Sequence, residues 1–178
     1  MTWVTLLLLV LLALVGANLY NKLVSARNAY RNAFAQIDVQ LTRRHDLVPN
    51  LVEVARRYLE HERETLEAVV SARSAAVDGL RRAAANITDP AAIQELASVE
   101  NTLAGALGRL LAVAEAYPDL KANQTMAQLT EELTSTENKV AFSRQFYNDV
   151  ATQYNTKQAQ FPTNLIAGMA KASPAELW

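Results

Sequence analysis

The stretch QTMAQLTEELTSTENKVAFSRQFYNDVATQYNTKQAQF, residues 124–161, decides the fold of this chain. Apolar side chains recur in it every seven residues, at Met126, Leu133, Val140, Tyr147, Tyr154 and Phe161. A second series, three residues later each time, turns polar in its middle, at Leu129, Thr136, Ser143, Val150 and Lys157. A seven-residue repeat with a mixed second seam is typical of helices that pack antiparallel in bundles. We therefore expect one long helix that starts between Pro118 and Asn123 and ends near Gln160.

Prolines and apolar stripes divide the preceding residues into three more helices. A helical stripe runs from Leu23 to Leu41 and predicts a first helix that ends near Asp46. Pro49 predicts a turn and the first position of a second helix that ends near Ala85. Asp89 and Pro90 predict the N-cap and first residue of a third helix that ends near Tyr117. With no segment of period two, we predict an all-α fold, an antiparallel up-down-up-down bundle of long helices.

The N-terminal stretch WVTLLLLVLLALVGANL, residues 3–19, carries no charge. Its seventeen residues span roughly 26 Å as a helix, the short end of what crosses a bilayer. A cleaved signal peptide is the alternative, with a weak cleavage site at Val15-Gly16-Ala17, but no Lys or Arg precedes the apolar run. We therefore predict a retained transmembrane anchor with membrane-facing residues Trp3, Leu7, Leu11, Val15, Leu19 and Tyr20.

Basic residues on one side of this run predict its orientation. Lys22, Arg27 and Arg31 follow it and none precedes it, so the positive-inside rule places the N-terminus outside and the bundle in the cytoplasm. No helix breaker separates the run from the residues that follow, so we expect one helix continuous with the bundle. The predicted division is a transmembrane anchor at 1–20, a helical bundle at 21–161 and an apolar C-terminal tail at 162–178.

The expected second helix is longer than the part of the first helix beyond the membrane by about ten residues, or roughly 15 Å. Packed antiparallel, it would extend past that part toward the membrane. Either the first helix bends away, or residues 81–95 dip beside the lipid headgroups, where Arg81 and Arg82 would reach phosphates. An ordinary solvated pair of arginines near a helix C-terminus is the alternative. The tail also has several interpretations. It ends in Leu177 and Trp178 and carries only two charges, so it is an interfacial membrane segment, a segment packed on the bundle base or a contact between copies.

The composition leaves few ways to build an active site. The chain of 178 residues has no cysteine, two histidines and a net charge of −1, which argues against thiolate chemistry, cysteine-bound zinc and nucleic-acid binding. Neither His45 nor His61 belongs to a Glu-x-x-His or His-Glu-x-x-His pattern. Gly105 and Gly108 indicate close helix packing rather than a phosphate loop. We predict no catalytic residues, no cofactor and no metal.

Polar residues instead gather on the last long helix and beside Pro49. The candidate cluster for partner binding or for internal structure is Asn50, Glu137, Asn138, Arg144, Asn148 and Asn155. Buried polar groups of this kind most often form hydrogen bonds between helices that fix their register. A groove for a small ligand is the alternative.

Two long segments resemble the LemA family of bacterial membrane proteins. RRHDLVPNLVEVARRYLEHERETLEAVVSARS (43–74) is similar to the family's central signature, and AYPDLKANQTMAQLTEELTSTENKVAFSRQFYNDVATQYNTKQAQFPTNLIAGM (116–169) to its C-terminal one. Residues 75–100 are richer in alanine, and the end ASPAELW lacks the polar close of many members. The resemblance implies a helical bundle on a single-span, N-out anchor in the bacterial cytoplasmic (inner) membrane. It also implies no established enzymatic activity, and one branch of the family is linked to magnetosome membranes.

Two functional hypotheses follow from these features. The first is a non-enzymatic, membrane-anchored scaffold or membrane-organising protein that presents its bundle for self-assembly or for protein partners. The second is a membrane-tethered signalling or stress-response module that binds a small ligand or partner at the polar patch of the last helix. The expected partners are the lipid bilayer, further copies of the chain and unknown membrane proteins, with no nucleic acid.

Overall fold

The computed structural model describes residues 2–170 and 172–178, and every regular element in that part of the chain is a helix. This confirms the all-α prediction. The helices are α1 (Thr2–Arg56), α2 (Arg63–Ala85), α3 (Pro90–Ala114), α4 (Pro118–Lys121), α5 (Gln124–Ala159) and α6 (Thr163–Ala167).

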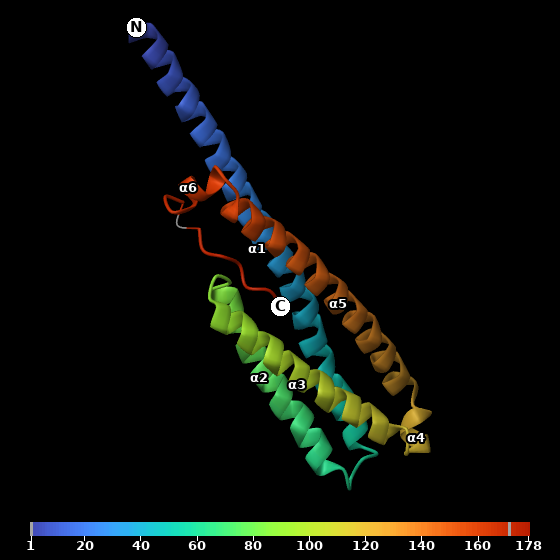
Figure 1. Ribbon diagram of the computed structural model, residues 1–178. Coiled ribbons are helices and arrows are strands. Elements are labelled where there is room, and N and C mark those ends of the chain that lie inside the picture. Colours follow the sequence, from blue (N-terminus) through green and yellow to red (C-terminus); the bar gives the residue numbers. More distant parts are fainter. Residues whose placement is uncertain (1, 171) are drawn as a thin grey trace.

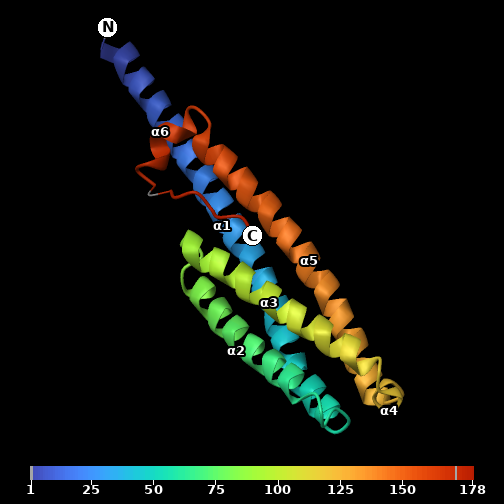
Figure 2. The ribbon, with the colours of Figure 1, turned by 60° about the horizontal axis from the view of Figure 1, so that its bottom comes forward.

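Helix α1 is the axis of the molecule. It lies between α5 and the hairpin of α2 and α3, and its N-terminal part extends alone beyond the other helices (Figures 1 and 2). Tyr30 of α1 packs on Tyr154 of α5 at 5.0 Å between ring centroids, while Arg44 pairs with Glu137, so α5 runs antiparallel to α1. The short α6 packs against both α1 and α5. The apolar N-terminal run and the bundle core therefore belong to one continuous helix, as predicted.

The predicted turn at Pro49 is wrong, because α1 passes through Pro49 and continues to Arg56. A proline inside a helix has no N–H for the carbonyl four residues earlier, which here is that of His45. The Arg73 side chain of α2 donates its Nε–H to that carbonyl oxygen at 2.7 Å and so satisfies it. The actual turn lies at residues 57–62, where no proline or glycine marks it.

The predicted overshoot of the second helix is also wrong, because α2 begins only at Arg63. Its C-terminal end lies beside Phe34 and Asp38 of α1, well short of Tyr20. Arg82 forms an ion pair with Glu95 of α3 at 2.7 Å, and Arg81 pairs with Asp78 at 3.2 Å. The two arginines therefore behave as ordinary surface residues.

The apolar seam of α5 is buried as the seven-residue repeat predicts. Met126, Leu133, Val140, Tyr147 and Tyr154 are all buried, and so are Thr136 and Ser143 of the polar second seam. Phe161, the last member of the repeat, lies beyond the end of α5 and is 79% exposed. The buried apolar side chains form two clusters, one nearer the N-terminal end of α1 and one nearer the 57–62 turn.

The predicted helix cap at Asp89 is present, whereas the predicted close contact at two glycines is not. The Asp89 side chain accepts from the Ala91 N–H, with Pro90 as first helical residue, as predicted. Gly105 and Gly108 were expected at a close helix contact, but a Cβ added at either would meet nothing within 4 Å, so that expectation is wrong. The close approach is at Gly79, where a Cβ would lie 2.8 Å from Cγ2 of Val99.

Candidate functional site

A layer of charged side chains separates the two apolar clusters in the middle of the molecule. Arg44 and His45 of α1 and Glu100 of α3 are each buried. The Glu100 carboxylate contacts His45 Nε2 at 2.7 Å through Oε1, and Arg44 Nη1 donates to its Oε2 at 3.3 Å. A buried carboxylate is thus shared by two side chains of the neighbouring helix.

Helix α5 completes this charged layer. Glu137 Oε1 lies 2.8 Å from Arg44 Nε, with the Glu137 side chain only partly buried. Burial, followed by the positive charge of Arg44, lowers the pKa of the Arg144 guanidinium, and the carboxylates of Glu100 and Glu137 oppose that shift. Arginine remains protonated in proteins, so Arg144 keeps its positive charge here. The charged layer, Arg44, Glu100, Glu137 and Arg144, with His45 in contact with Glu100, therefore joins α1, α3 and α5 at one level of the bundle.

The second polar arrangement holds the segment 172–178 against α5. Asn155 donates its Nδ2–H to the Ala175 carbonyl at 2.9 Å and accepts from the Ala175 N–H at 2.7 Å. Asn148 makes the same pair of bonds with the main chain of Trp178, at 3.2 and 2.8 Å. The Tyr147 and Tyr154 hydroxyls donate to the carbonyls of Glu176 and Ser173 at 2.7 and 3.1 Å.

Further contacts fix the same segment. Gln158 donates to the Ala172 carbonyl at 2.6 Å, and Gln94 of α3 donates to the Glu176 side chain at 2.8 Å. The Arg144 guanidinium lies 5.1 Å from the ring centre of Trp178, a cation–π contact. Figure 1 shows the segment running back from α6 toward the end of the α2–α3 hairpin. Of the three interpretations of the tail, residues 172–178 take the one in which it packs on the bundle.

The six predicted polar residues therefore divide into two pairs and two single residues. Glu137 and Arg144 belong to the charged layer, and Asn148 and Asn155 hold the tail. Asn50 is exposed on α1, away from the other five. Asn138 is exposed and lines an open hollow of about 700 Å³ between the end of α3 and α5. The structure does not bring the six together into one ligand site.

The predicted anchor residues lie along the free part of α1. Trp3, Leu7, Leu11, Val15 and Tyr20 are exposed and Leu19 is half-buried. By length and composition this part of α1 is a candidate membrane span, and none of the residues of its most apolar stretch is buried in the protein. Helix α6 lies beside the end of this free part that is nearer the bundle. There Ile166 and Met169 line a hollow of about 310 Å³ together with Tyr20.

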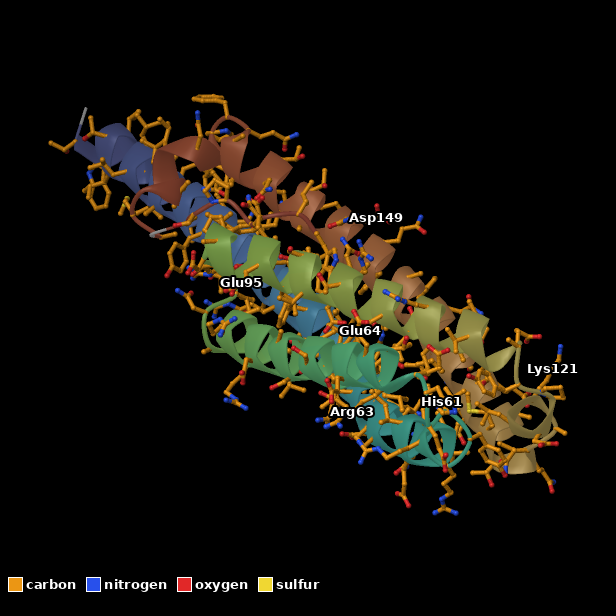
Figure 3. All side chains as sticks on the ribbon, turned by 90° about the horizontal axis from the view of Figure 1, so that it is seen from below. His61, Arg63, Glu64, Glu95, Lys121 and Asp149 are labelled. Atoms are coloured by element: carbon orange, nitrogen blue, oxygen red, sulfur yellow. The ribbon has the colours of Figure 1, made fainter. Side chains whose placement is uncertain are left out.

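Other charged residues lie on the outside. Lys121, the last residue of α4, and Asp149, on the outer side of α5, are at the periphery in Figure 3 and are exposed. His61 is exposed at the 57–62 turn. Among the described residues, no three His, Cys, Asp or Glu side chains are grouped so as to hold a metal ion.

Sequence reasoning missed Arg44, His45 and Glu100 as a cluster, although a signal was present. Glu100 stands in the apolar stripe of α3 between Leu96 and Leu103, and Arg44 and His45 continue the stripe of α1 after Leu41. A charged residue at a core position of a helix predicts a buried partner, because an unpaired buried charge is costly. The pattern does not name the partner.

Comparison with known proteins shows similarity over most of the chain. The model of the LemA family matches residues 33–178. Protein LemA of Metamycoplasma hominis is 30% identical over 147 residues, which are 83% of this chain and 63% of that protein. Magnetosome protein MamQ 2 of Paramagnetospirillum magneticum is 32% identical over 81 residues, 46% of this chain and 30% of that protein. Magnetosome protein MamQ of Magnetospirillum gryphiswaldense is 25% identical over 163 residues, and the match covers 83% of this chain and 60% of that protein. The chain thus spans less than two thirds of the length of each of these relatives.

Proposed function

This chain belongs to the LemA family, and on that premise we propose that it is a membrane-anchored, non-enzymatic scaffold or membrane-organising protein. Its helical bundle is presented for self-assembly or for protein partners. The observation that carries the proposal is the free part of α1, where a run of exposed apolar side chains is continuous with the helix that forms the bundle core. Such a surface is stable only when lipid or another protein covers it.

The proposed topology is a single span in the bacterial inner membrane, with a retained anchor and the N-terminus outside. Lys22, Arg27 and Arg31 support it, because they follow the apolar run and belong on the cytoplasmic side. The bundle, with its up-down-up-down order of helices, then lies in the cytoplasm. Protease added to intact spheroplasts should leave residues 21–178 undigested. Digestion of these residues from outside would show that the topology is the opposite one.

A second contact with lipid supports the membrane-organising form of the proposal. Phe161, Leu165 and Met169 are all exposed on and around α6, which lies beside the inner end of the anchor. Apolar side chains at that level meet the boundary between headgroups and acyl chains. The MamQ relatives are named as magnetosome proteins.

Self-assembly is tested by the mass of the particle after purification in a mild detergent. The scaffold proposal expects a mass of two or more chains, measured by light scattering with correction for bound detergent. Crosslinking in native membranes should give the same multiple, together with any partner protein. A strictly monomeric particle in both measurements would contradict self-assembly.

A further inference from the structure

The tail-binding face of α5, which consists of Tyr147, Asn148, Tyr154, Asn155 and Gln158, repeats a two-residue unit. The pair Tyr-Asn stands at 147–148 and again at 154–155, seven residues later. Each tyrosine donates to a main-chain carbonyl of the tail, at Glu176 and Ser173. Each asparagine forms two hydrogen bonds with the main chain two residues further along the tail, at Trp178 and Ala175. Three tail residues therefore correspond to seven residues of the helix.

These two spacings match for a geometric reason. Seven residues of an α-helix rise about 10.5 Å. Three residues of extended chain cover about 10 Å. A helix that repeats Tyr-Asn every seven residues can therefore meet every third residue of an extended chain laid antiparallel along it without losing register.

Contacts on this face are directed mainly at the main chain of the tail. Five side chains of α5 form seven hydrogen bonds with main-chain groups of the tail, five with carbonyls and two with N–H groups. Every non-proline residue carries both groups. The side chains of the tail matter at few points. Ala175 is buried, so that a much larger side chain there would have to displace its neighbours, and the Trp178 ring lies over the Arg144 guanidinium.

The tail-binding face needs an extended segment upon it. Ala175 is buried and Trp178 is partly buried against the same apolar cluster, so departure of the tail would uncover them together with Tyr147 and Tyr154 of α5. The tyrosine and asparagine side chains would then lack the main-chain partners that they have in the structure, and unpaired polar groups in a half-buried site are unfavourable. Another extended segment of the same kind restores all of these bonds.

We propose that the tail-binding face is an exchangeable recognition site for an extended peptide segment, and that its second occupant is segment 172–178 of a neighbouring copy. The inference rests on the proposed self-assembly and supplies a contact for it. Exchange of an identical element between copies needs no new interface, because the second copy makes the same bonds. Anchoring on one membrane surface raises the local concentration of the neighbouring tail.

The first test uses full-length protein in detergent and a fluorescent peptide. The probe is Ala-Ser-Pro-Ala-Glu-Leu-Trp, the sequence of residues 172–178, amidated at its end and labelled at its start. Ala175→Arg displaces the protein's own tail, so this variant should bind the probe saturably in an anisotropy titration. Wild-type protein should bind it at least about tenfold more weakly, since its own tail competes at high effective concentration.

A matched variant tests whether the site reads the main chain. Asn148→Ala and Asn155→Ala added to Ala175→Arg should weaken binding at least about tenfold. A probe N-methylated at the position of Ala175 carries a methyl group in place of the amide hydrogen that Asn155 accepts, and it should also bind about tenfold more weakly to Ala175→Arg protein. The helical circular dichroism of each variant verifies its fold. Absence of saturable binding to folded Ala175→Arg protein, or unchanged affinity without the two asparagines, would overturn the inference.

Complementation identifies the neighbouring copy as the occupant. The Ala175→Arg variant keeps its face but not its tail contact, and the Asn148→Ala/Asn155→Ala variant keeps its tail but not its face. Labelled with different fluorophores and mixed in nanodiscs, the two should transfer energy more strongly than either variant with itself. Equal transfer in all three mixtures excludes tail exchange. If wild-type protein is then still oligomeric by mass, self-assembly stands through another contact, whereas a monomeric wild type removes the proposed self-assembly as well.

Discussion

At the scale of single residues, one buried carboxylate holds the middle of the molecule together. Glu100 is 3% exposed and is shared between Arg44 and His45. Such groups rarely raise stability above that of an apolar core, but loss of Glu100 leaves His45 without its carboxylate and Arg44 with Glu137 alone. The charged layer therefore links α1, α3 and α5 through ion pairs at one level of the bundle.

Glu100→Ala should lower the free energy of unfolding by about 3–5 kcal/mol, because Arg44 and His45 lose their shared partner in a buried site. Glu95→Ala is the matched control, since Glu95 pairs with Arg82 on the surface at half exposure. That change should cost about 0–1 kcal/mol. Urea unfolding of both variants in the same detergent measures the difference. Equal losses in the free energy of unfolding would show that the charged layer contributes no more to stability than a surface ion pair.

Alkaline pH should destabilise the protein through Tyr147. Burial, followed by the nearby Tyr30 and Glu176, raises the pKa of Tyr147 above its ordinary value of 10.0. The folded chain then keeps a proton that the unfolded chain releases, so stability is complete below pH 10 and falls as pH rises above it. Tyr147→Phe should lose about 1 kcal/mol at pH 8 with its bond to Glu176, yet show a weaker loss above pH 10. If urea unfolding shows that Tyr147→Phe loses as much stability above pH 10 as the wild type, the alkaline destabilisation comes from another group.

At the scale of elements, the α2–α3 hairpin depends on a glycine. Gly79→Ala would place a Cβ 2.8 Å from Val99 Cγ2, and a valine side chain has little freedom to move aside. The change should therefore destabilise the protein by about 1–3 kcal/mol.

Gly105→Ala on α3 is the matched control, because nothing lies within 4 Å of its added Cβ. It should raise stability by about 0.5–1 kcal/mol through helix propensity alone. Thermal unfolding followed by circular dichroism compares the two. Effects of the same sign would contradict the packing of α2 on α3.

At the scale of the whole molecule, one helix serves both the membrane and the bundle. Leu9→Arg, in the middle of the exposed apolar run, should disfavour insertion by about 3 kcal/mol. Val39→Arg, at an exposed position of α1 within the bundle, should leave insertion unchanged. The membrane fraction that resists carbonate extraction measures both. Full retention of the Leu9→Arg variant would argue against a span at this place.

The sequence by itself determined the helical class, the apolar run of α1, the buried seam of α5 and the cap at Asp89. Each of these follows from spacing within a few turns of one helix, because burial and capping there depend on neighbours in the sequence. The tertiary structure alone decided that α1 continues past Pro49, since the bond that permits it comes from Arg73 of another helix. It also decided the pairing of Glu100 with Arg44 and His45, and the return of residues 172–178 onto the tyrosines and asparagines of α5. These contacts join residues far apart in the chain, and a pattern along one helix shows which side chains need a partner but not which distant group supplies it.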